Sequence, residues 1–197
     1  MLIGISGGIG SGKSVVSEIL RVMGRPVYDC DSEAKRIMDT DCGIHSSLCA
    51  RLHPEAVVDG RPNRALISEI VFADPESLAA LNEIVHGAVF ADIARWRASH
   101  SDHRVLFVES AIMRSSGLSE YIDAEWHVTA PLEVRIERVQ RRSSLTREQV
   151  LARIDSQSQE DLSKCEENLS GDRFALIDNS PSAALLPQLH RLLEEYD

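Results

Sequence analysis

Apolar residues follow two different spacings along the chain of 197 residues, and these predict strands and helices that alternate. Short apolar runs bounded by turn residues predict five strands, at 2–6, 25–28, 105–108, 126–129 and 175–177. Apolar residues spaced three or four apart predict helices from about 13, 132, 146 and 185. Strands that alternate with helices are typical of an α/β fold with a parallel sheet.

The middle of the chain follows a different pattern. From about 42 to 101 the strand pattern disappears and the spacing is helical, with interruptions at 59–62 and 74–75 where Gly and Pro occur. The length of the chain suits one core with small insertions rather than two independent domains. We therefore expect a single domain, 1–197, with a core of 1–30, 102–134 and 158–197, a helical insertion at about 31–101 and a small lid region at about 135–157.

The segment from Gly7 to Ser14 fits the pattern G-x-x-x-x-G-K-[ST], and it lies between a predicted strand and a predicted helix. Its glycines let the backbone curl so that successive N–H groups point at a phosphate, and the start of the helix adds positive potential there. Lys13 can reach the β- and γ-phosphates, and the hydroxyl of Ser14 can ligate a magnesium ion shared with the nucleotide.

Two other interpretations of this segment fit less well. A glycine-rich turn that happens to end in Lys-Ser would not require the flanking strand and helix. A dinucleotide-binding fingerprint starting at Gly8 would need glycine at position 13, where Lys13 stands. The motif therefore predicts a nucleoside-triphosphate binder.

Charge and composition narrow the partners. The formal net charge of −10 opposes non-specific adhesion to nucleic acid. No stretch approaches the roughly 20 apolar residues of a membrane span, and we find no pattern of a cleaved leader at the N-terminus. We expect a cytoplasmic protein that binds neither nucleic acid nor a membrane.

The cysteines lack the spacing of zinc ligands, which indicates scattered reduced thiols and no structural metal. They are Cys30, Cys42, Cys49 and Cys165.

Two carboxylates follow the second predicted strand. Asp29 and Asp31 come directly after 25–28 and before a helical stretch, in a turn with good N-cap chemistry. Ligands of parallel α/β sheets gather at the carboxyl ends of the strands, so both carboxylates are candidates for chemistry. We choose Asp31 as the group that orients a nucleophile. Helix capping is the alternative for both, and it is the stronger alternative for Asp29.

Arginines occupy one face of the helix predicted from about 132. Arg135, Arg138 and Arg142 are spaced three and four apart, and a lid that carries them could close the site and exclude water. The alternative is a solvated face on which they pair with Glu133 and Glu137.

A histidine in the insertion also has two interpretations. His86 precedes Val89, Phe90 and Ile93 at helical spacing, so it is either a partly buried histidine or a ligand contact. The pattern alone leaves both open.

Taken together, these motifs resemble the dephospho-coenzyme A kinase family over most of the chain. The ordered set that carries the resemblance comprises the loop Gly7–Ser14, Asp29-x-Asp31, Arg64 followed by Val71-Phe72 and Asp74, Leu81-Asn82-x-Ile84-Val85-His86, Arg138-x-x-x-Arg142, Arg153-x-x-x-Gln157 and Ile177-Asp178-Asn179.

The resemblance implies a P-loop NTPase-like three-layer sandwich with a sheet of about five strands. It also implies transfer of the γ-phosphate of ATP, with Mg²⁺, to the ribose 3'-hydroxyl of dephospho-coenzyme A, the last step of coenzyme A synthesis. The helical insertion would bind that acceptor. A monomer or weak homo-oligomer is expected.

Roles for individual residues follow from the same resemblance. Asp31 is implied as the base or orienter, Lys13 and Arg142 as catalytic cations, Ser14 as the metal ligand, and Arg64 and His86 with Asp31 as acceptor contacts. The implied ATP contacts are Gly8, Ile9, Gly10, Ser11, Gly12, Lys13, Ser14, Val15, Arg138, Arg142 and Asn179.

The chain departs from the usual family pattern in three places. Gly87 stands where proline is common, Arg135 where glutamine is usual, and Glu109-Ser110-Ala111-Ile112 where many members have an apolar Pro-Leu-Leu segment. These departures bear on the acceptor pocket rather than on the reaction.

Two rival functions stay open. Another small-molecule kinase of this architecture would act on a nucleoside or a sugar acid. A nucleotide-dependent switch ATPase would hydrolyse ATP without an acceptor, whereas a kinase should be nearly idle until its acceptor arrives.

Overall fold

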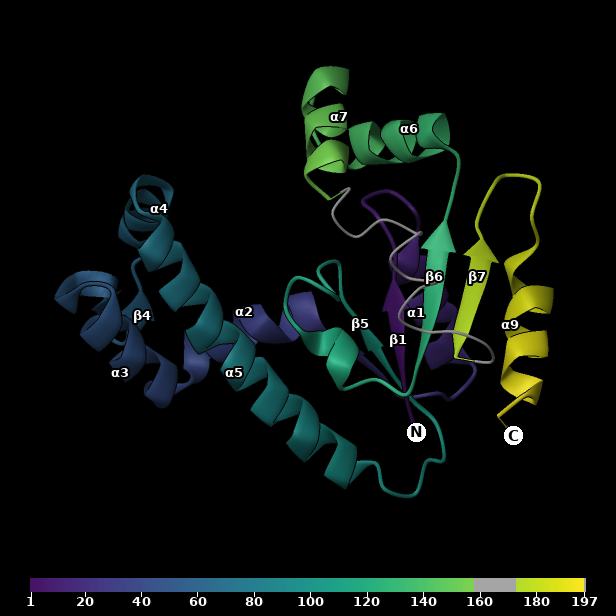
Figure 1. Ribbon diagram of the computed structural model, residues 1–197, viewed down its shortest axis with the longest axis horizontal. Coiled ribbons are helices and arrows are strands. Elements are labelled where there is room, and N and C mark those ends of the chain that lie inside the picture. Colours follow the sequence, from purple (N-terminus) through teal and green to yellow (C-terminus); the bar gives the residue numbers. More distant parts are fainter. Residues whose placement is uncertain (158–172, 197) are drawn as a thin grey trace. The chain divides into compact units, whose positions relative to one another are not determined.

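The computed structural model describes residues 1–157 and 173–196, so Cys165 and the first part of the predicted core segment 158–197 lie outside the described residues. A five-stranded sheet has the order β2-β5-β1-β6-β7 (Figure 1). Its strands are β1 (Leu2–Ser6), β2 (Val27–Asp29), β5 (Leu106–Glu109), β6 (Ala124–Thr129) and β7 (Phe174–Asp178). The predicted α/β fold with a parallel five-stranded sheet is confirmed.

Two helices build the main core on one face of this sheet. Helix α1 (Lys13–Val22) and helix α9 (Leu185–Glu194) turn an apolar stripe toward the strands. Ile5 of β1 and Trp126 of β6 are fully buried with Leu20 and Leu189 of these helices in one cluster. This packing explains the helical spacing of apolar residues after the first and fifth predicted strands.

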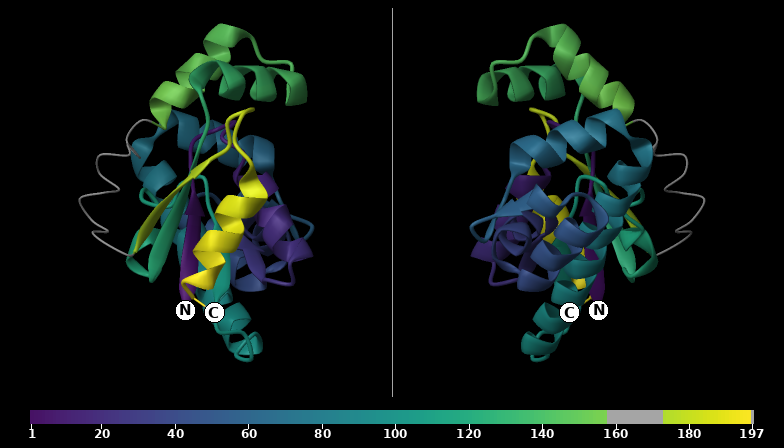
Figure 2. Two further views of the ribbon diagram at one scale, coloured as in Figure 1. Left: turned by 90° about the vertical axis from the view of Figure 1, so that its right-hand side faces the viewer. Right: turned by 90° about the vertical axis from the view of Figure 1, so that its left-hand side faces the viewer.

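Helices α6 (Leu132–Arg142) and α7 (Arg147–Ser156) form a pair beyond the end of the sheet to which the strands point (Figure 2). A small cluster of Ile136, Val139 and Val150 joins them. The first turn of α7 carries a capping box in which the Thr146 hydroxyl and the Gln149 side chain each bind the other residue's backbone. The pair therefore has its own apolar core and a well-defined helix start.

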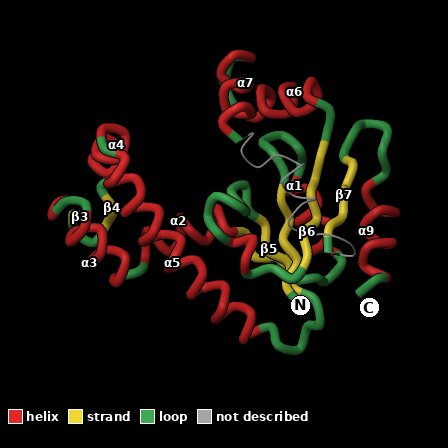
Figure 3. Tube along the Cα trace, viewed as in Figure 1, coloured by secondary structure: helices red, strands yellow, loops and turns green. Residues whose placement is uncertain are grey.

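The chain divides into two compact units, Met1–Tyr28 with His100–Asp197 and Asp29–Ser99. The second unit is nearly all helical (Figure 3). Its helices are α2 (Cys30–Thr40), α3 (Cys42–Arg51), α4 (Arg64–Ala73) and α5 (Pro75–Ser99), with a 3₁₀ turn, η1, at Pro54–Ala56. Helix α5 packs against each of the other three α-helices of its unit.

One expectation for this stretch is wrong. We expected no strands between about 42 and 101, yet β3 (Val57–Val58) and β4 (Arg61–Pro62) form an antiparallel hairpin. The turn between them places Asp59 at φ 51° and Gly60 at φ 71°, as a two-residue hairpin turn requires. Strands of two residues are too short to produce an alternating pattern, so only the Asp-Gly turn signalled them.

Within the described residues, one helix is long enough and apolar enough in composition to cross a membrane, and this helix is α5. Core helices of soluble proteins pass the same test. Here α5 packs on α2, α3 and α4, and its Asp92 forms ion pairs with Arg36 and Arg95. The composition of α5 is therefore weak evidence of a membrane span.

A buried polar cluster lies on the sheet face opposite α1 and α9. It includes Ser6, the last residue of β1 before the glycine-rich loop. The Ser6 hydroxyl donates to Glu125, and the ring nitrogen Nδ1 of His127 lies 2.9 Å from the Ser6 oxygen. Arg114 donates to the other oxygen of Glu125 at 3.1 Å, and the Glu125 side chain is 1% exposed. Since Ser6 gives its one proton to the carboxylate, His127 is the donor in the second contact.

This cluster holds Glu125 as a carboxylate. Burial alone raises the pKa of Glu125, but the neighbouring His127, the hydrogen bond from Ser6 and the charge of Arg114 outweigh it and leave the pKa below its usual value. A depressed folded-state pKa means that the cluster stabilises the fold fully above the unfolded pKa of about 4.3 and loses this contribution as the pH falls through the folded-state pKa.

We predict that Glu125→Gln lowers the free energy of unfolding by about 1–3 kcal/mol at neutral pH, because it removes the buried carboxylate that the partly buried Arg114 guanidinium binds. Urea unfolding of both proteins at several pH values measures this. The difference should begin to shrink as the pH falls below about 4.3, where the carboxylate of the unfolded chain takes up protons, and should be lost once the pH is below the lower pKa of the folded state.

Glu137→Gln is the matched control for this prediction, since Glu137 forms an exposed ion pair with Arg141. It should change stability by no more than about 0.5 kcal/mol. A Glu125→Gln difference that is unchanged from neutral pH to acid would contradict the assignment of a charged Glu125.

Candidate active site

The loop between β1 and α1 is shaped by glycines at positions where no other residue fits. Gly12 has φ 100° and caps the start of α1, and a Cβ there would collide with the side-chain amide of Asn179. Gly10 has φ 78°, and a Cβ there would lie 2.5 Å from the backbone oxygen of Arg135. Both positive φ and close packing therefore demand glycine at these two positions.

Cationic and amide side chains bind the carbonyl oxygens of this loop. The ammonium of Lys13 donates to Gly7 O at 2.6 Å. Arg138 Nη1 donates to Ser11 O at 3.2 Å and more weakly to Gly10 O at 3.5 Å, and Asn179 Nδ2 donates to Ser11 O at 2.7 Å. Because carbonyls are held in this way, the loop can present N–H groups to an anion, which is the property that a phosphate site needs.

Arg138 also ties this loop to the end of β7. Its Nη2 donates to Asn179 O at 2.9 Å, while Asn179 N donates to Thr129 O at 2.8 Å at the end of β6. Asn179 is buried. One guanidinium and one amide thus connect α6, the loop and two strand ends, and the sequence predicted both residues as ATP contacts.

A cavity of about 420 Å³ opens beside the loop. Its volume lies in the range of small-molecule sites, roughly 300–1,000 Å³. Most of its lining was predicted from the sequence: Gly10, Gly12, Ser14, Val15, Arg138, Arg142 and Asn179. Arg141 also lines it, although it was not among the residues predicted for the site.

The arginine face of α6 is not a simple solvated face. Glu133 pairs with Arg147 of α7, and Glu137 pairs with Arg141, so neither acid pairs with the three predicted arginines. The solvated-face alternative is therefore wrong for Arg135 and Arg138. Arg135 does not line the cavity; its Nε donates to Ile9 O at 3.0 Å, and burial lowers its pKa.

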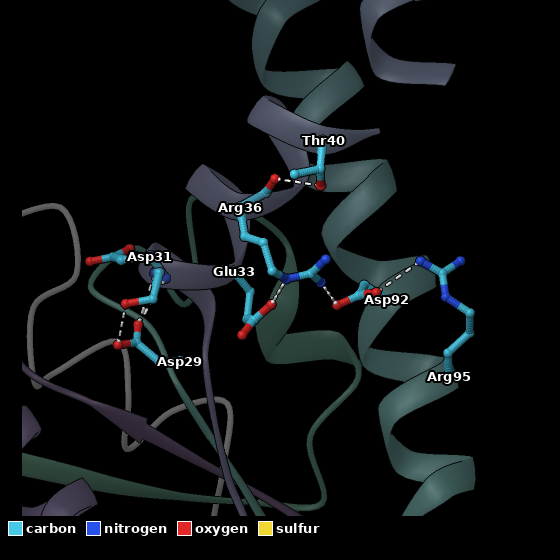
Figure 4. A network of polar contacts seen from close by, with 8 residues as sticks. Asp29, Asp31, Glu33, Arg36, Thr40, Asp92 and Arg95 are labelled. Atoms are coloured by element: carbon cyan, nitrogen blue, oxygen red, sulfur yellow. Dashed lines mark hydrogen bonds and ion pairs between the residues drawn. The ribbon is translucent and has the colours of Figure 1, made fainter. Parts of the chain in front are cut away.

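The two candidate aspartates have different local roles (Figure 4). Asp29 is the N-cap of α2, and its carboxylate accepts from the backbone N–H groups of Asp31 and Ser32 and from the Ser32 hydroxyl. Helix α2 begins at Cys30, so the segment expected as a turn is already its first turn. Within the described residues no hydrogen bond or ion pair involves the carboxylate of Asp31, so capping is wrong for Asp31 and right for Asp29.

Helix α2, which carries Asp31, is held to α5 by a chain of ion pairs (Figure 4). Arg36 pairs with Glu33 on its own helix and, at 2.9 Å, with Asp92 of α5. Asp92 also pairs with Arg95 at 2.8 Å, and its side chain is only 16% exposed. The pKa of Arg36 is raised by its hydrogen bond to Glu33 and by both acids. These pairs fix the rotation of α2, and with it the direction of Asp31, within the helical unit.

The other predicted acceptor residues also belong to the helical unit. Arg64 opens α4 and pairs with Asp39 of α2 at 2.7 Å, with more than half of its side chain exposed. His86 lies half-buried in α5 with its ring 6.5 Å from that of Phe90, and burial lowers its pKa. The interpretation of His86 as a partly buried histidine fits these contacts.

One candidate was missed among the sequence predictions. Glu109 is the last residue of β5 and is paired in register with Ile5 of β1, so its carboxylate group belongs to the strand beside the one that leads into the glycine-rich loop. We treated it only as part of an unusual segment. The available signal was an acid at the end of an apolar strand, the same signal that singled out Asp29.

Known proteins match this chain over most of its length. A family model described as dephospho-CoA kinase matches residues 1–180. A dephospho-CoA kinase of Bacteroides fragilis is 40% identical over 192 residues, which cover 97% of this chain and 90% of the relative. A dephospho-CoA kinase of Thermus thermophilus is 40% identical over 161 residues, or 82% of this chain and 77% of the relative.

Solved structures agree with this match. The crystal structure of TT1252 from Thermus thermophilus covers 100% of this chain and 98% of its own, with 35% identity and a TM-score of 0.77. A dephospho-CoA kinase from Campylobacter jejuni covers 99% and 96% with 22% identity and a TM-score of 0.68, which shows a shared fold. From its strand order, its glycine-rich loop and these matches together, the chain belongs to the dephospho-CoA kinase family.

Proposed function

We propose that this protein transfers the γ-phosphoryl group of ATP to the ribose 3'-hydroxyl of dephospho-coenzyme A, the last step of coenzyme A synthesis. The observation that carries the proposal is a glycine-rich loop whose carbonyls are bound by Lys13, Arg138 and Asn179 beside a cavity of about 420 Å³. Family membership supports the identity of the acceptor.

The loop and the arginines of α6 would neutralise the transferred group. In the loop from Gly8 to Val15, the N–H groups that the protein does not already bind would contact the triphosphate, and Lys13 would leave Gly7 O for the β- and γ-phosphates. Arg142 lines the cavity and is exposed, so its guanidinium can turn toward developing charge. Arg138 and Asn179 keep the loop in shape and contact the nucleotide at the cavity that they line.

The nucleophile would be oriented by Asp31. Its carboxylate is not used as the helix cap, and α2 is held by the Arg36–Asp92 pair. In in-line attack by the ribose hydroxyl, Asp31 would accept the proton late, because a loose transition state requires little early deprotonation. The new bond joins the 3'-oxygen to the γ-phosphorus, while the bond to the β-phosphate oxygen breaks and ADP leaves.

Magnesium fits the oxygen donors at the loop. Ser14 lies in the first turn of α1 and lines the cavity, and Glu109 ends the neighbouring strand. Mg²⁺ prefers hydroxyl, carboxylate and phosphate oxygens and keeps several waters, so few protein ligands suffice. When bound, it would neutralise phosphate charge. We propose Ser14 as the direct ligand and Glu109 as an acceptor for water bound to the ion.

The helical unit Asp29–Ser99 would hold the acceptor. Arg64 offers an exposed guanidinium that an anionic group could take over from Asp39, and His86 offers a half-buried ring. The α6–α7 pair would be the lid that excludes water from the γ-phosphate.

We further propose a cytoplasmic monomer or weak homo-oligomer that binds neither nucleic acid nor membrane. The net charge of −10 supports the absence of nucleic-acid binding, because it opposes non-specific adhesion to a polyanion.

We predict that ATP turnover depends on the acceptor. Adding dephospho-coenzyme A should raise ADP release by at least about 100-fold, the scale on which positioning of a reactant acts. A coupled ADP assay with and without acceptor measures this. Equal turnover without acceptor would indicate a switch ATPase, and a preference for a nucleoside or a sugar acid in the same assay would indicate another small-molecule kinase.

Asp31→Asn should lower kcat by about 10²–10⁴, because the variant cannot accept the proton. ATP affinity, measured by titration without acceptor, should stay within about twofold, far below the tenfold change that 1.4 kcal/mol produces. The matched control is Asp29→Asn, since asparagine is also a good N-cap and should preserve α2 and the activity. Comparable turnover in Asp31→Asn would remove Asp31 from the mechanism.

Ser14→Ala should raise the Mg²⁺ concentration needed for half-maximal activity by about tenfold, the effect of losing one direct ligand worth about 1.4 kcal/mol. Glu109→Gln should raise this Mg²⁺ concentration less, because losing a water-mediated contact weakens magnesium binding less than losing a direct ligand. A magnesium titration at saturating ATP measures both. Unchanged magnesium curves in both variants would show that neither residue serves the ion.

A further inference from the structure

Ile9 is the loop residue most closely tied to the α6–α7 pair. Its N–H donates to Gln157 Oε1 at 2.7 Å, where Gln157 is the C-cap of α7. Its carbonyl accepts from Arg135 Nε of α6 at 3.0 Å. Its side chain packs against the cluster of Ile136, Val139 and Val150 that joins the two helices. All three parts of this one residue are therefore bound by α6 and α7.

Arg135 packs closely on the same part of the loop. A Cβ on Gly8 would collide with its guanidinium, so glycine at position 8 leaves the space that this arginine occupies. Its backbone oxygen lies against Gly10, again at a distance that no Cβ would tolerate. The segment Gly8-Ile9-Gly10 thus fits against α6 along its whole length.

The two helices that hold Ile9 are themselves fastened together. Both guanidinium nitrogens of Arg147, at 2.7 and 2.8 Å, donate to the two carboxylate oxygens of Glu133. This bidentate pair links the first turn of α7 to the first turn of α6 and adds to their shared apolar cluster. Displacing either helix would therefore disturb the contacts of both with Ile9.

The amide of Ile9 is engaged by protein and is not offered to an anion. Ser11 N–H is likewise used, because it donates to Gly8 O at 3.1 Å. The conformation that presents the other loop N–H groups is thus supported from the side of α6 and α7. A ligand that fixes the loop also fixes the position of Ile9 and, through it, the two helices.

We propose that Ile9 couples the phosphate loop to the lid, and that Gln157 and Arg135 are positioning residues that let a bound nucleoside polyphosphate stabilise the docked lid. The proposal rests on the assignment of Gly7–Ser14 as the nucleotide site. It requires no direct contact between Gln157 and the nucleotide. Coupling of this kind is reciprocal: whatever the nucleotide adds to lid docking, docking adds to nucleotide affinity.

The first measurement is amide hydrogen exchange of α7 in the wild-type protein with and without Mg·ADP. Bound ADP should slow exchange of α7 amides by about fivefold or more, which is the effect of one net hydrogen bond. Exchange in α9, which lies in the main core, serves as the internal reference. If ADP binds but leaves α7 exchange unchanged, the proposal is overturned.

The second measurement uses Gln157→Met, which keeps the length of the side chain but removes the oxygen that accepts from Ile9. The variant should lose most of the ADP-induced protection of α7, and its affinity for Mg·ADP should fall by the same factor, about fivefold. Gln140→Met, an exposed glutamine of α6, is the matched control and should change neither quantity.

Ile9→Val gives an independent route, because it trims the side chain in the lid cluster and leaves the backbone contacts in place. When Ile9→Val is combined with Gln157→Met, the fold-loss in ADP affinity should be smaller than the product of the losses in the two single variants. Both substitutions weaken the same contact between the loop and the α6–α7 pair. If Gln157→Met lowers the melting temperature but preserves ADP affinity and protection, the contact serves packing alone and the proposal fails. These ADP measurements need no acceptor, so their outcome is independent of whether dephospho-coenzyme A is the substrate.

Discussion

The site depends on how the carbonyl oxygens of one loop are bound. A tight loop that offers N–H groups to an anion must direct its carbonyls elsewhere, and buried carbonyls left without donors are costly. Here Gly7 O is bound by Lys13, Ile9 O by Arg135, and Ser11 O by both Arg138 and Asn179. The donors come from α1, from α6 and from the end of β7. The loop's shape is therefore a property of the folded unit and not of its glycines alone.

The sequence predicts this site well where local chemistry decides the outcome. Short apolar runs identified all five strands of the main sheet, because buried parallel strands need continuous apolar stretches. The loop, Arg138 and Asn179 were expected at the nucleotide site, and the structure brings them together around one cavity. What the spacing could not give was the partner of each arginine. Arg135 and Arg138 contact loop carbonyls more than a hundred residues away in sequence, and helical periodicity carries no such information.

The buried cluster at β6 shows a second limit. Alternation of Glu125, Trp126 and His127 would indicate a strand with one face in water. The structure buries both faces, and Arg114 with Ser6 compensates the carboxylate on the polar side. The local sequence pattern shows which strand residues are polar, whereas their burial depends on which other segment covers that face of the sheet. The β3–β4 hairpin was missed for a simpler reason, since two residues per strand cannot show a period.

The distribution of arginine in this acidic protein follows from the same constraint. A lysine ammonium binds as a point charge, whereas a guanidinium presents donors in a fixed fork and can serve two acceptors at once. Arg138 uses this fork to hold Ser11 O and Asn179 O, which belong to segments far apart in the chain. Partial burial of such a cation is tolerable because carbonyl dipoles replace lost water. Arginines fixed in this way carry positive charge at the loop despite a net charge of −10, so the site can attract a polyphosphate while the rest of the surface repels one.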